Sequence, residues 1–255
     1  MRYLILSLII LLGLSSHAIS GTRDPSVSDS KYIEYGQKHE CVVRVSGKVK
    51  IKDSEETATF FGSGVIVRPR VLITAAHVVQ NTETAYAVIG DEKIKIIGFA
   101  CPNADQEKEV GPHDIAVCWL EKEVELDFYP ELYDKSDEMG KICSLAGWGM
   151  KGTWNTGIID SDGKKRAGSN FVDKELFKGM LVCSVDKEPY TSLEYLIGNG
   201  DSGGGLFIDK KLAGIHSCIF TDDGKLDSSK RDWSAHTRVS FHRAWIEEFI
   251  KIMEE

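Results

Sequence analysis

A glycine-rich segment, Gly200-Asp201-Ser202-Gly203-Gly204, surrounds a serine in a way that suits nucleophilic catalysis. Glycines let the backbone turn tightly and leave amide N–H groups free to face a substrate oxygen. The Ser202 hydroxyl would be the nucleophile, and the N–H groups of Gly200 and Ser202 would form an oxyanion hole. Taken alone, such a turn is equally typical of an ordinary loop.

Two further segments supply a base and an acid that could activate this serine. Thr74-Ala75-Ala76-His77 follows an apolar run at 71–73, so a strand end would deliver the imidazole to the rim of a barrel. Asp114 follows His113 and precedes another apolar run, where it could orient the imidazole. A single histidine or aspartate in such a place is more often a packed or turn residue. The presence of all three motifs in the order His, Asp, Ser favours a catalytic triad.

The elements that would position these residues are short and rich in β-branched side chains. Clusters of Gly, Asp, Asn and Lys separate them and are typical of turns. This spacing predicts an all-β fold, either a sandwich or a barrel. The expected strands are residues 41–45, 65–67, 71–73, 87–89, 93–98, 115–120, 141–146, 179–184, 205–208, 212–217 and 235–239.

Two regions depart from the strand pattern. From Phe241 to Met253 the apolar residues recur at helical spacing, which predicts a single C-terminal amphipathic helix. Residues 121–140 are acidic, include Pro130 and show few strand signals. We interpret them as a linker between two halves of the chain.

These motifs together make the sequence resemble the trypsin/chymotrypsin family of serine endopeptidases. The resemblance covers essentially the whole chain after residue 18. It is carried by residues 74–77, Asp114-Ile115-Ala116, Gly147-Trp148-Gly149, residues 200–204, Gly214-Ile215-His216-Ser217 and Thr237-Arg238-Val239.

The resemblance implies an all-β fold of two packed six-stranded antiparallel β-barrels, with a cleft between them and a C-terminal α-helix. Residues 19–130 would form the N-terminal barrel, with His77 and Asp114. Residues 131–255 would form the C-terminal barrel, with Ser202 and the helix.

The implied activity is hydrolysis of peptide bonds through an acyl-enzyme. Ser202 would attack, His77 would take its proton and pass it to the leaving amine, and Asp114 would hold the imidazole. Ser217 would support Asp114 and present its backbone to an extended substrate. No cofactor is implied, and the absence of a close CxxC pair gives no reason to assign a metal.

The residues expected to line the substrate pocket argue against a preference for Lys or Arg. Leu196, followed by Ile197, stands where trypsin carries an acid, and an unpaired cation in an apolar pocket is strongly disfavoured. Asn199 and Cys218 belong to the same predicted pocket, and Cys218 replaces the aromatic residue that usually lines the substrate channel.

Two histidines leave the preferred substrate open. His216 and His236 stand where glutamyl endopeptidases of this family use imidazoles to recognise an acidic P1 side chain. Alternatively, both could be satisfied core residues. Ile219 could then narrow the pocket, which would favour a small or medium apolar P1 side chain.

The six cysteines lie at positions 41, 101, 118, 143, 183 and 218. An even count in an exported chain predicts disulfide bonds, although a core of this size can also keep buried free thiols. Phe61 and Val78 stand where the family commonly has the disulfide that brackets the catalytic histidine. Gly198 stands where a cysteine usually helps frame the pocket, so the family's pairing does not carry over.

The N-terminus predicts export. Arg2, an apolar run at 3–14 and the small residues of Ser16-His17-Ala18 are typical of a signal peptide cleaved after residue 18, giving a secreted or periplasmic protein. An uncleaved signal anchor is the alternative. Cleavage would expose Ile19, and the resemblance implies that its ammonium pairs with Asp201 to shape the oxyanion hole. A further cut within residues 21–38 would give a different mature end.

The charge balance limits the partners. A net charge of −8 and the lack of clustered Lys and Arg, apart from residues 164–166, argue against binding to nucleic acid or an anionic membrane. We therefore expect a monomer whose partners are polypeptide substrates. The alternative from another functional class is a protease-like binding module without catalysis, which would call for a broken triad.

Overall fold

The computed structural model describes residues 21–51, 55–102, 110–185, 188, 190–222, 224–225 and 227–254. The predicted signal peptide and Ile19 lie outside these residues. Within the described ranges, no helix combines the length and the apolar character needed to cross a bilayer.

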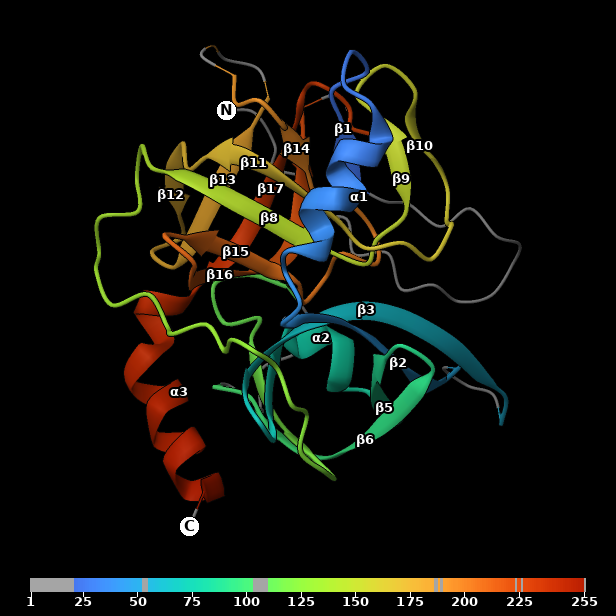
Figure 1. Cartoon of the computed structure of the whole chain (residues 1–255), viewed down its shortest axis with the longest axis vertical. Helices are drawn as coiled ribbons and strands as arrows, with labels where there is room; N and C mark the ends of the chain where they lie inside the picture. Colours follow the sequence, from blue (N-terminus) through green and yellow to red (C-terminus); the bar gives the residue numbers. More distant parts are fainter. Residues whose placement is uncertain are drawn as a thin grey trace.

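The N-terminal half is a closed six-stranded antiparallel barrel, drawn in teal and green in the lower half of Figure 1. Apolar side chains fill its interior, and Val65, Leu72 and Ile73 are fully buried. Gly64 permits this packing, because a Cβ there would lie 2.9 Å from Cδ1 of Leu72. The strands in order around the barrel are β2 (Val42–Lys50), β3 (Thr57–Arg68), β4 (Val71–Thr74), β7 (Ala116–Leu120), β6 (Glu92–Ala100) and β5 (Thr82–Ile89).

The C-terminal half is built on a seven-stranded antiparallel sheet and not on the expected six strands. The added strand, β12, is a three-residue edge strand that pairs only with β13 among the described strands. The strands in spatial order are β11 (Arg166–Phe171), β8 (Ile142–Gly147), β15 (Gly205–Ile208), β16 (Lys211–Thr221), β17 (Asp232–Arg238), β13 (Met180–Ser184) and β12 (Lys174–Leu176).

A small third sheet joins the start of the described chain to two segments of the C-terminal half. β1 (Gly21–Arg23) lies between β9 (Lys151–Thr153), with which it is parallel, and β14 (Tyr195–Leu196), with which it is antiparallel. β10 (Gly157–Asp160) completes the sheet beside β9. The N-terminal strand is therefore held on both sides.

The C-terminal helix is confirmed as α3 (Val239–Glu254). It buries Val239, Ile246 and Ile250 and contacts β7 of the barrel as well as β16 of the second half. The short helix α2 (Ala76–Val79) follows β4 directly. Residues 121–140 contain no described helix or strand and form only an isolated bridge at Leu132.

Helix α1 (Asp29–Gln37) was not expected from the sequence. Its nine residues are mostly polar and it buries only Tyr32 and Gly36, so its apolar stripe is too narrow to stand out. It packs on β11, as the blue ribbon in Figure 1 shows. Tertiary contacts, rather than helical periodicity, therefore stabilise it.

All six cysteines lie within the described residues, and all are free thiols. The predicted disulfide bonds are therefore absent from this structure. Cys143 and Cys183 face one another in the core with their Sγ atoms 3.8 Å apart, well beyond a bond of about 2.05 Å. Buried apolar side chains supply the core of both halves, and these buried thiols pack as small apolar groups.

Candidate active site

His77 lies on α2 and is oriented by a buried carboxylate. Its Nδ1 contacts Asp114 Oδ2 at 2.8 Å, and its backbone N–H donates to Asp114 Oδ1 at 3.0 Å. Ser217 Oγ donates to Asp114 Oδ2 at 2.5 Å. The Asp114 side chain is inaccessible, whereas 24% of the His77 side chain is exposed. The imidazole can therefore meet a substrate while its acidic partner stays away from water.

The turn that carries Ser202 packs against the segment that carries His77. The backbone N–H of Ser63 donates to the Ser202 carbonyl at 2.8 Å. Gly203 has a φ of 86°, and a Cβ there would lie 2.0 Å from Thr74 Oγ1. Only glycine meets both conditions. The serine turn and the end of β4 are therefore in direct contact across the two halves.

The backbone around Gly200, the predicted oxyanion hole, is held by a left-handed φ and by a hydrogen bond to its carbonyl. Gly200 has a φ of 85°, and its carbonyl accepts a hydrogen bond from Ser63 Oγ at 2.8 Å. Ser63 Oγ in turn accepts the Trp148 N–H at 2.9 Å. Among the described residues, neither Gly200 N–H nor Ser202 N–H forms a hydrogen bond. Both donors are available to a substrate oxygen.

Asp201, which precedes Ser202, is fully buried. Gly149 N–H donates to its Oδ1 at 2.8 Å, and Gly198 N–H and Tyr195 OH donate to its Oδ2 at 3.0 and 3.2 Å. Burial raises the pKa of Asp201 to about 6, although these hydrogen bonds and the charge of Arg166 act in the opposite direction.

The predicted floor of the substrate pocket is apolar. Leu196 and Ile197 are both buried, and no acid stands at this position. The Ile197 N–H donates to Ser234 Oγ at 2.9 Å, and Ser228 Oγ donates to the Ile197 carbonyl at 2.8 Å. Two hydroxyls thus fix the Ile197 backbone. Asn199 is half-buried at the start of the oxyanion turn.

His216 and His236 are brought together by the register of β16 and β17, which places them opposite one another. Their Nδ1 atoms are 2.9 Å apart, and both rings are fully buried. The Nε2 atom of His236 has no hydrogen-bond partner among the described residues, whereas the Ala146 backbone lies beside His216 and favours its protonated form. Burial lowers the pKa of His216 well below its usual value and that of His236 to about 3. Both imidazoles are therefore neutral near pH 7.

The remaining predicted substrate-binding residues follow His216 on β16. The register shifts between His216 and Cys218, so Ser217 lies in an irregularity of the strand. Ser217 is buried against Asp114, while Cys218 and Ile219 are half-buried. Burial raises the pKa of the Cys218 thiol to about 12, so this side chain is an uncharged wall residue.

The family model described as Trypsin matches residues 35–246. The chain belongs to the trypsin family. Within it, the chain is 28% identical over 172 residues to "Trypsin" of Simulium vittatum, a match that covers 60% of this chain and 68% of the relative.

Two further proteins are similar to this chain, one in sequence and one in fold. An "Inactive CLIP domain-containing serine protease A8" of Anopheles gambiae is 27% identical over 116 residues, which is 38% of this chain but only 31% of that protein. Neuropsin, described as a serine protease expressed in the limbic system of mouse brain, has the same fold. Its TM-score is 0.62 at 18% identity, covering 84% of this chain and 96% of that one.

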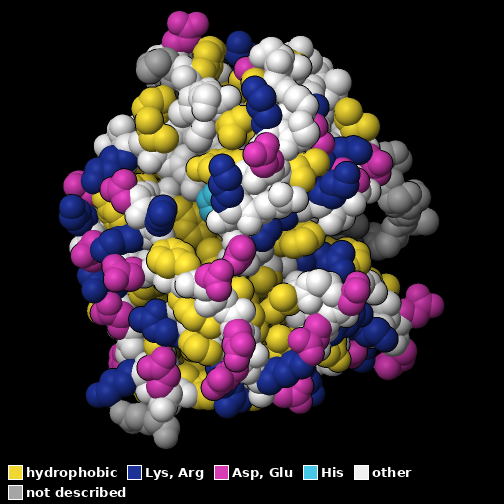
Figure 2. Space-filling view, in the orientation of Figure 1, with side chains coloured by type: hydrophobic (Ala, Val, Ile, Leu, Met, Phe, Trp, Pro, Cys, Tyr) yellow, Lys and Arg dark blue, Asp and Glu magenta, His cyan; other side chains and the backbone are white. Residues whose placement is uncertain are grey.

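The surface of this trypsin-family chain carries both signs of charge. On the face drawn in Figure 2, Lys and Arg side chains alternate with Asp and Glu and form no continuous basic patch there.

Sequence reasoning missed two residues of the site. Ser63 buttresses the Gly200 carbonyl, and Tyr195 binds the Asp201 carboxylate. Ser63 offered only the signal of lying between Gly62 and Gly64, and Tyr195 offered none, because it precedes the predicted pocket residue Leu196 on a strand of two residues. Both were found only from their contacts.

Proposed function

We propose that this chain is a secreted serine endopeptidase that acts on polypeptides through His77, Asp114 and Ser202. Two observations carry the proposal. Ser217 binds Asp114 and Asp114 binds His77, and the turn that contains Ser202 packs against the end of β4, directly before His77. A buried acid, a partly exposed imidazole and a serine beside free backbone donors are the parts that acyl transfer needs.

Each group has one task in the proposed reaction. Ser202 Oγ attacks the peptide carbonyl and transfers its proton to His77 Nε2, while Gly200 N–H and Ser202 N–H stabilise the oxyanion. His77 then protonates the leaving amine, and a water molecule hydrolyses the acyl-enzyme by the same route. Asp114 keeps the proton of the neutral imidazole on Nδ1 and stabilises the imidazolium.

Labelling with a fluorophosphonate tests this function. We expect one equivalent of covalent label per chain, located on Ser202 and lost in Ser202→Ala. The competing function, a protease-like binding module, has some support in the name of the inactive Anopheles relative. A folded wild-type protein that takes up no label would favour that module.

For substrate choice, we propose an acidic P1 residue recognised through the His216–His236 pair. The supporting observations are that the two Nδ1 atoms lie 2.9 Å apart and that the buried Nε2 of His236 has no partner among the described residues, so the pair has unused hydrogen-bonding capacity. The apolar alternative rests on the burial of the same rings and on Ile219 at the pocket wall.

The Glu/Gln selectivity ratio should depend on pH. Both imidazoles are neutral in the free protein because burial depresses their pKa values. A substrate carboxylate would favour the protonated pair, so binding of Glu should take up a proton. We expect the ratio of kcat/KM for Glu over Gln to be about tenfold or more and to fall as pH rises, by up to about tenfold per pH unit.

A matched histidine variant controls this measurement. His216→Ala should abolish the preference for Glu. His39→Gln should keep it, although His39 is also a histidine whose pKa burial lowers. Cleavage by the wild-type enzyme after Ala, Val or Leu, with none after Glu, would show that the histidines are structural and that Ile219 shapes the pocket.

For activation, we propose that cleavage after Ala18 frees the Ile19 ammonium to pair with Asp201. A Cβ on Gly21 would lie 2.8 Å from Asp201 Oδ2, so the chain passes beside the carboxylate two residues after Ile19. A cut within residues 21–38 would detach β1 or α1, and β1 is held between two strands. Cleavage after Ala18 leaves both elements attached, so it agrees better with the fold than a cut within residues 21–38.

An extra residue placed before Ile19 should reduce kcat/KM by about a hundredfold or more, because a buried carboxylate loses its charged partner. The melting temperature should change much less. The ammonium should also lower the pKa of Asp201 below the value of about 6 that burial sets, so activity would extend to lower pH only in the correctly cut enzyme. Secreted protein that starts elsewhere, by N-terminal sequencing, and is fully active would refute the pair.

A further inference from the structure

The Asp201 carboxylate fills a slot that leaves little room for another orientation. A Cβ on Gly147 would lie 2.3 Å from its Oδ1, and a Cβ on Gly149 would lie 2.5 Å from its Cγ. The backbone is tied down as well, because the Asp201 carbonyl accepts the Gly204 N–H at 2.8 Å. The Asp201 carboxylate and the carbonyl of the peptide group that joins Asp201 to Ser202 are therefore both fixed.

Tyr195 is the side-chain donor to this carboxylate among the described residues, beside two backbone amides. Its ring is only 1% exposed. Gly168 lies directly under it, since a Cβ there would fall 2.2 Å from Tyr195 Cβ, and Asn170 Nδ2 donates to the Tyr195 carbonyl at 3.0 Å. Tyr195 is thus fixed from the β11 side through its Cβ and its carbonyl.

Helix α1 supports the other side of the tyrosine. The rings of Tyr32 and Tyr195 lie 6.1 Å apart at an angle of 35°. Tyr32 is fully buried, and its hydroxyl donates to the Glu194 carbonyl at 3.2 Å. Through this contact α1 holds both the ring and the backbone next to it.

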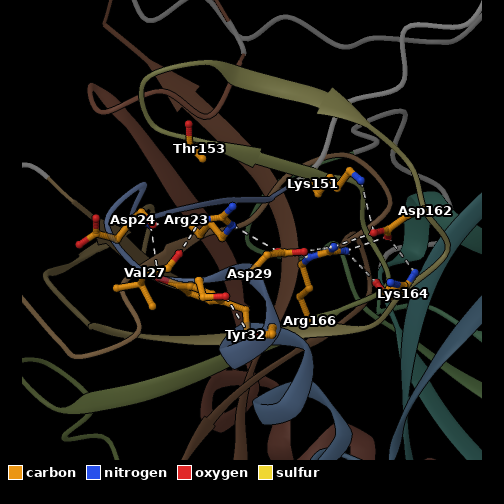
Figure 3. Close-up of polar contacts among 12 residues, drawn as sticks. Arg23, Asp24, Val27, Asp29, Tyr32, Lys151, Thr153, Asp162, Lys164 and Arg166 are labelled. Carbon is orange, nitrogen blue, oxygen red and sulfur yellow. Dashed lines mark hydrogen bonds and ion pairs between the residues drawn. The ribbon is translucent and has the colours of Figure 1, made fainter.

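An ion-pair cluster around Arg166 holds α1 in place (Figure 3). The guanidinium, 2% exposed, binds the Asp29 carboxylate at 2.8 and 2.7 Å and the Asp162 carboxylate at 2.9 and 2.8 Å. Arg23 joins Asp29 at 3.2 Å, and Lys151 joins Asp162 at 3.6 Å. Loss of either carboxylate would leave a buried charge partly unpaired, so displacement of α1 is costly.

We propose that Tyr195 is a positioning residue of the turn that contains Ser202. Its hydroxyl holds the Asp201 carboxylate, so that Gly200 N–H and Ser202 N–H face the substrate. Helix α1 in turn holds Tyr195. The inference rests on the proposed protease function. It differs from activation by the chain terminus, because the phenol is part of the folded chain before any cleavage.

Tyr195→Phe tests the proposal, because it removes one oxygen atom and keeps the buried ring. We expect kcat for a peptide amide to fall about tenfold or more, with KM nearly unchanged, since a hydrogen bond to a charged group is lost. Tyr133→Phe is the matched control. Tyr133 is a tyrosine buried in the same core cluster, and its hydroxyl donates to Asp137 at 2.7 Å.

The pH profile separates positioning from a loss of packing. The Tyr195 hydroxyl favours the ionised form of Asp201, and Arg166 is the charged side chain that acts in the same direction. Without the phenol the pKa of Asp201 should rise further, so the acid limb of kcat/KM should move to higher pH in Tyr195→Phe. The control should keep the wild-type profile.

The outcomes distinguish the two proposals. A wild-type protein that labels with fluorophosphonate, together with a Tyr195→Phe variant of unchanged kcat and unchanged acid limb, overturns the role of Tyr195 and leaves the protease function standing. A wild-type protein that does not label overturns both. Should Tyr195→Phe fail to fold, 3-fluorotyrosine incorporated into the wild type provides the test. One buried 19F resonance should then titrate with Asp201, and its absence would overturn the contact.

Discussion

Replacing Ser202 by alanine is expected to lower the turnover of a peptide substrate about a million-fold, since a triad acts as a unit. The substitution removes only the hydroxyl. None of the contacts described above for the turn uses the Ser202 hydroxyl, and the Ser202 carbonyl that accepts the Ser63 N–H remains. The melting temperature should therefore stay within a few degrees of the wild-type value.

Single-turnover kinetics and active-site titration of purified Ser202→Ala would measure this loss. Ser169→Ala is a suitable control, because Ser169 lies on β11 with its hydroxyl bonded to Thr191. It should retain normal turnover. Activity of Ser202→Ala within tenfold of the wild type would show that another group is the nucleophile.

The parts of the molecule that the sequence predicted well are those whose signals lie within a few neighbouring residues. α3 was predicted because Ile246 and Ile250 recur at helical spacing and are buried in the fold. The glycines around Ser202 predicted a tight turn, and Gly203 has a positive φ and a close contact with Thr74 that only glycine allows. In both cases the residue type itself carries the physical requirement.

The parts that could not be predicted depend on contacts between distant segments. Helix α1 has no strong periodicity, and it is held by Arg166, which lies more than a hundred residues further along the chain. The Tyr195–Asp201 hydrogen bond depends on where a two-residue strand is placed. The disulfide prediction followed from counting cysteines, and a count says nothing of whether two thiols approach.

The histidine pair was predicted only in part. The positions of His216 and His236 in the sequence suggested a pair, and the register of two neighbouring strands places them opposite one another. The sequence left open whether the two rings lie in the core, and it could not supply the lowered pKa values that their burial causes. That burial is why the pH dependence of selectivity, rather than the positions alone, tests their role.

Replacing Asp114 by asparagine is expected to lower turnover about 10⁴-fold near neutral pH, with little effect on folding. Oδ2 of Asp114 faces His77 Nδ1, and Oδ1 accepts the backbone N–H of His77, so both atoms must be acceptors. An amide offers only one acceptor. The backbone N–H cannot change its role but the imidazole can, so the amide oxygen should face the backbone and its NH₂ should face Nδ1.

The imidazole must then carry its proton on Nε2, the atom that has to receive the proton of Ser202. The variant would have the right geometry and the wrong tautomer. Steady-state kinetics beside a thermal melt would measure the effect, and Asp209→Asn, an exposed aspartate in the turn between β15 and β16, should behave as the wild type. A loss of less than tenfold in Asp114→Asn would mean that another acid orients His77.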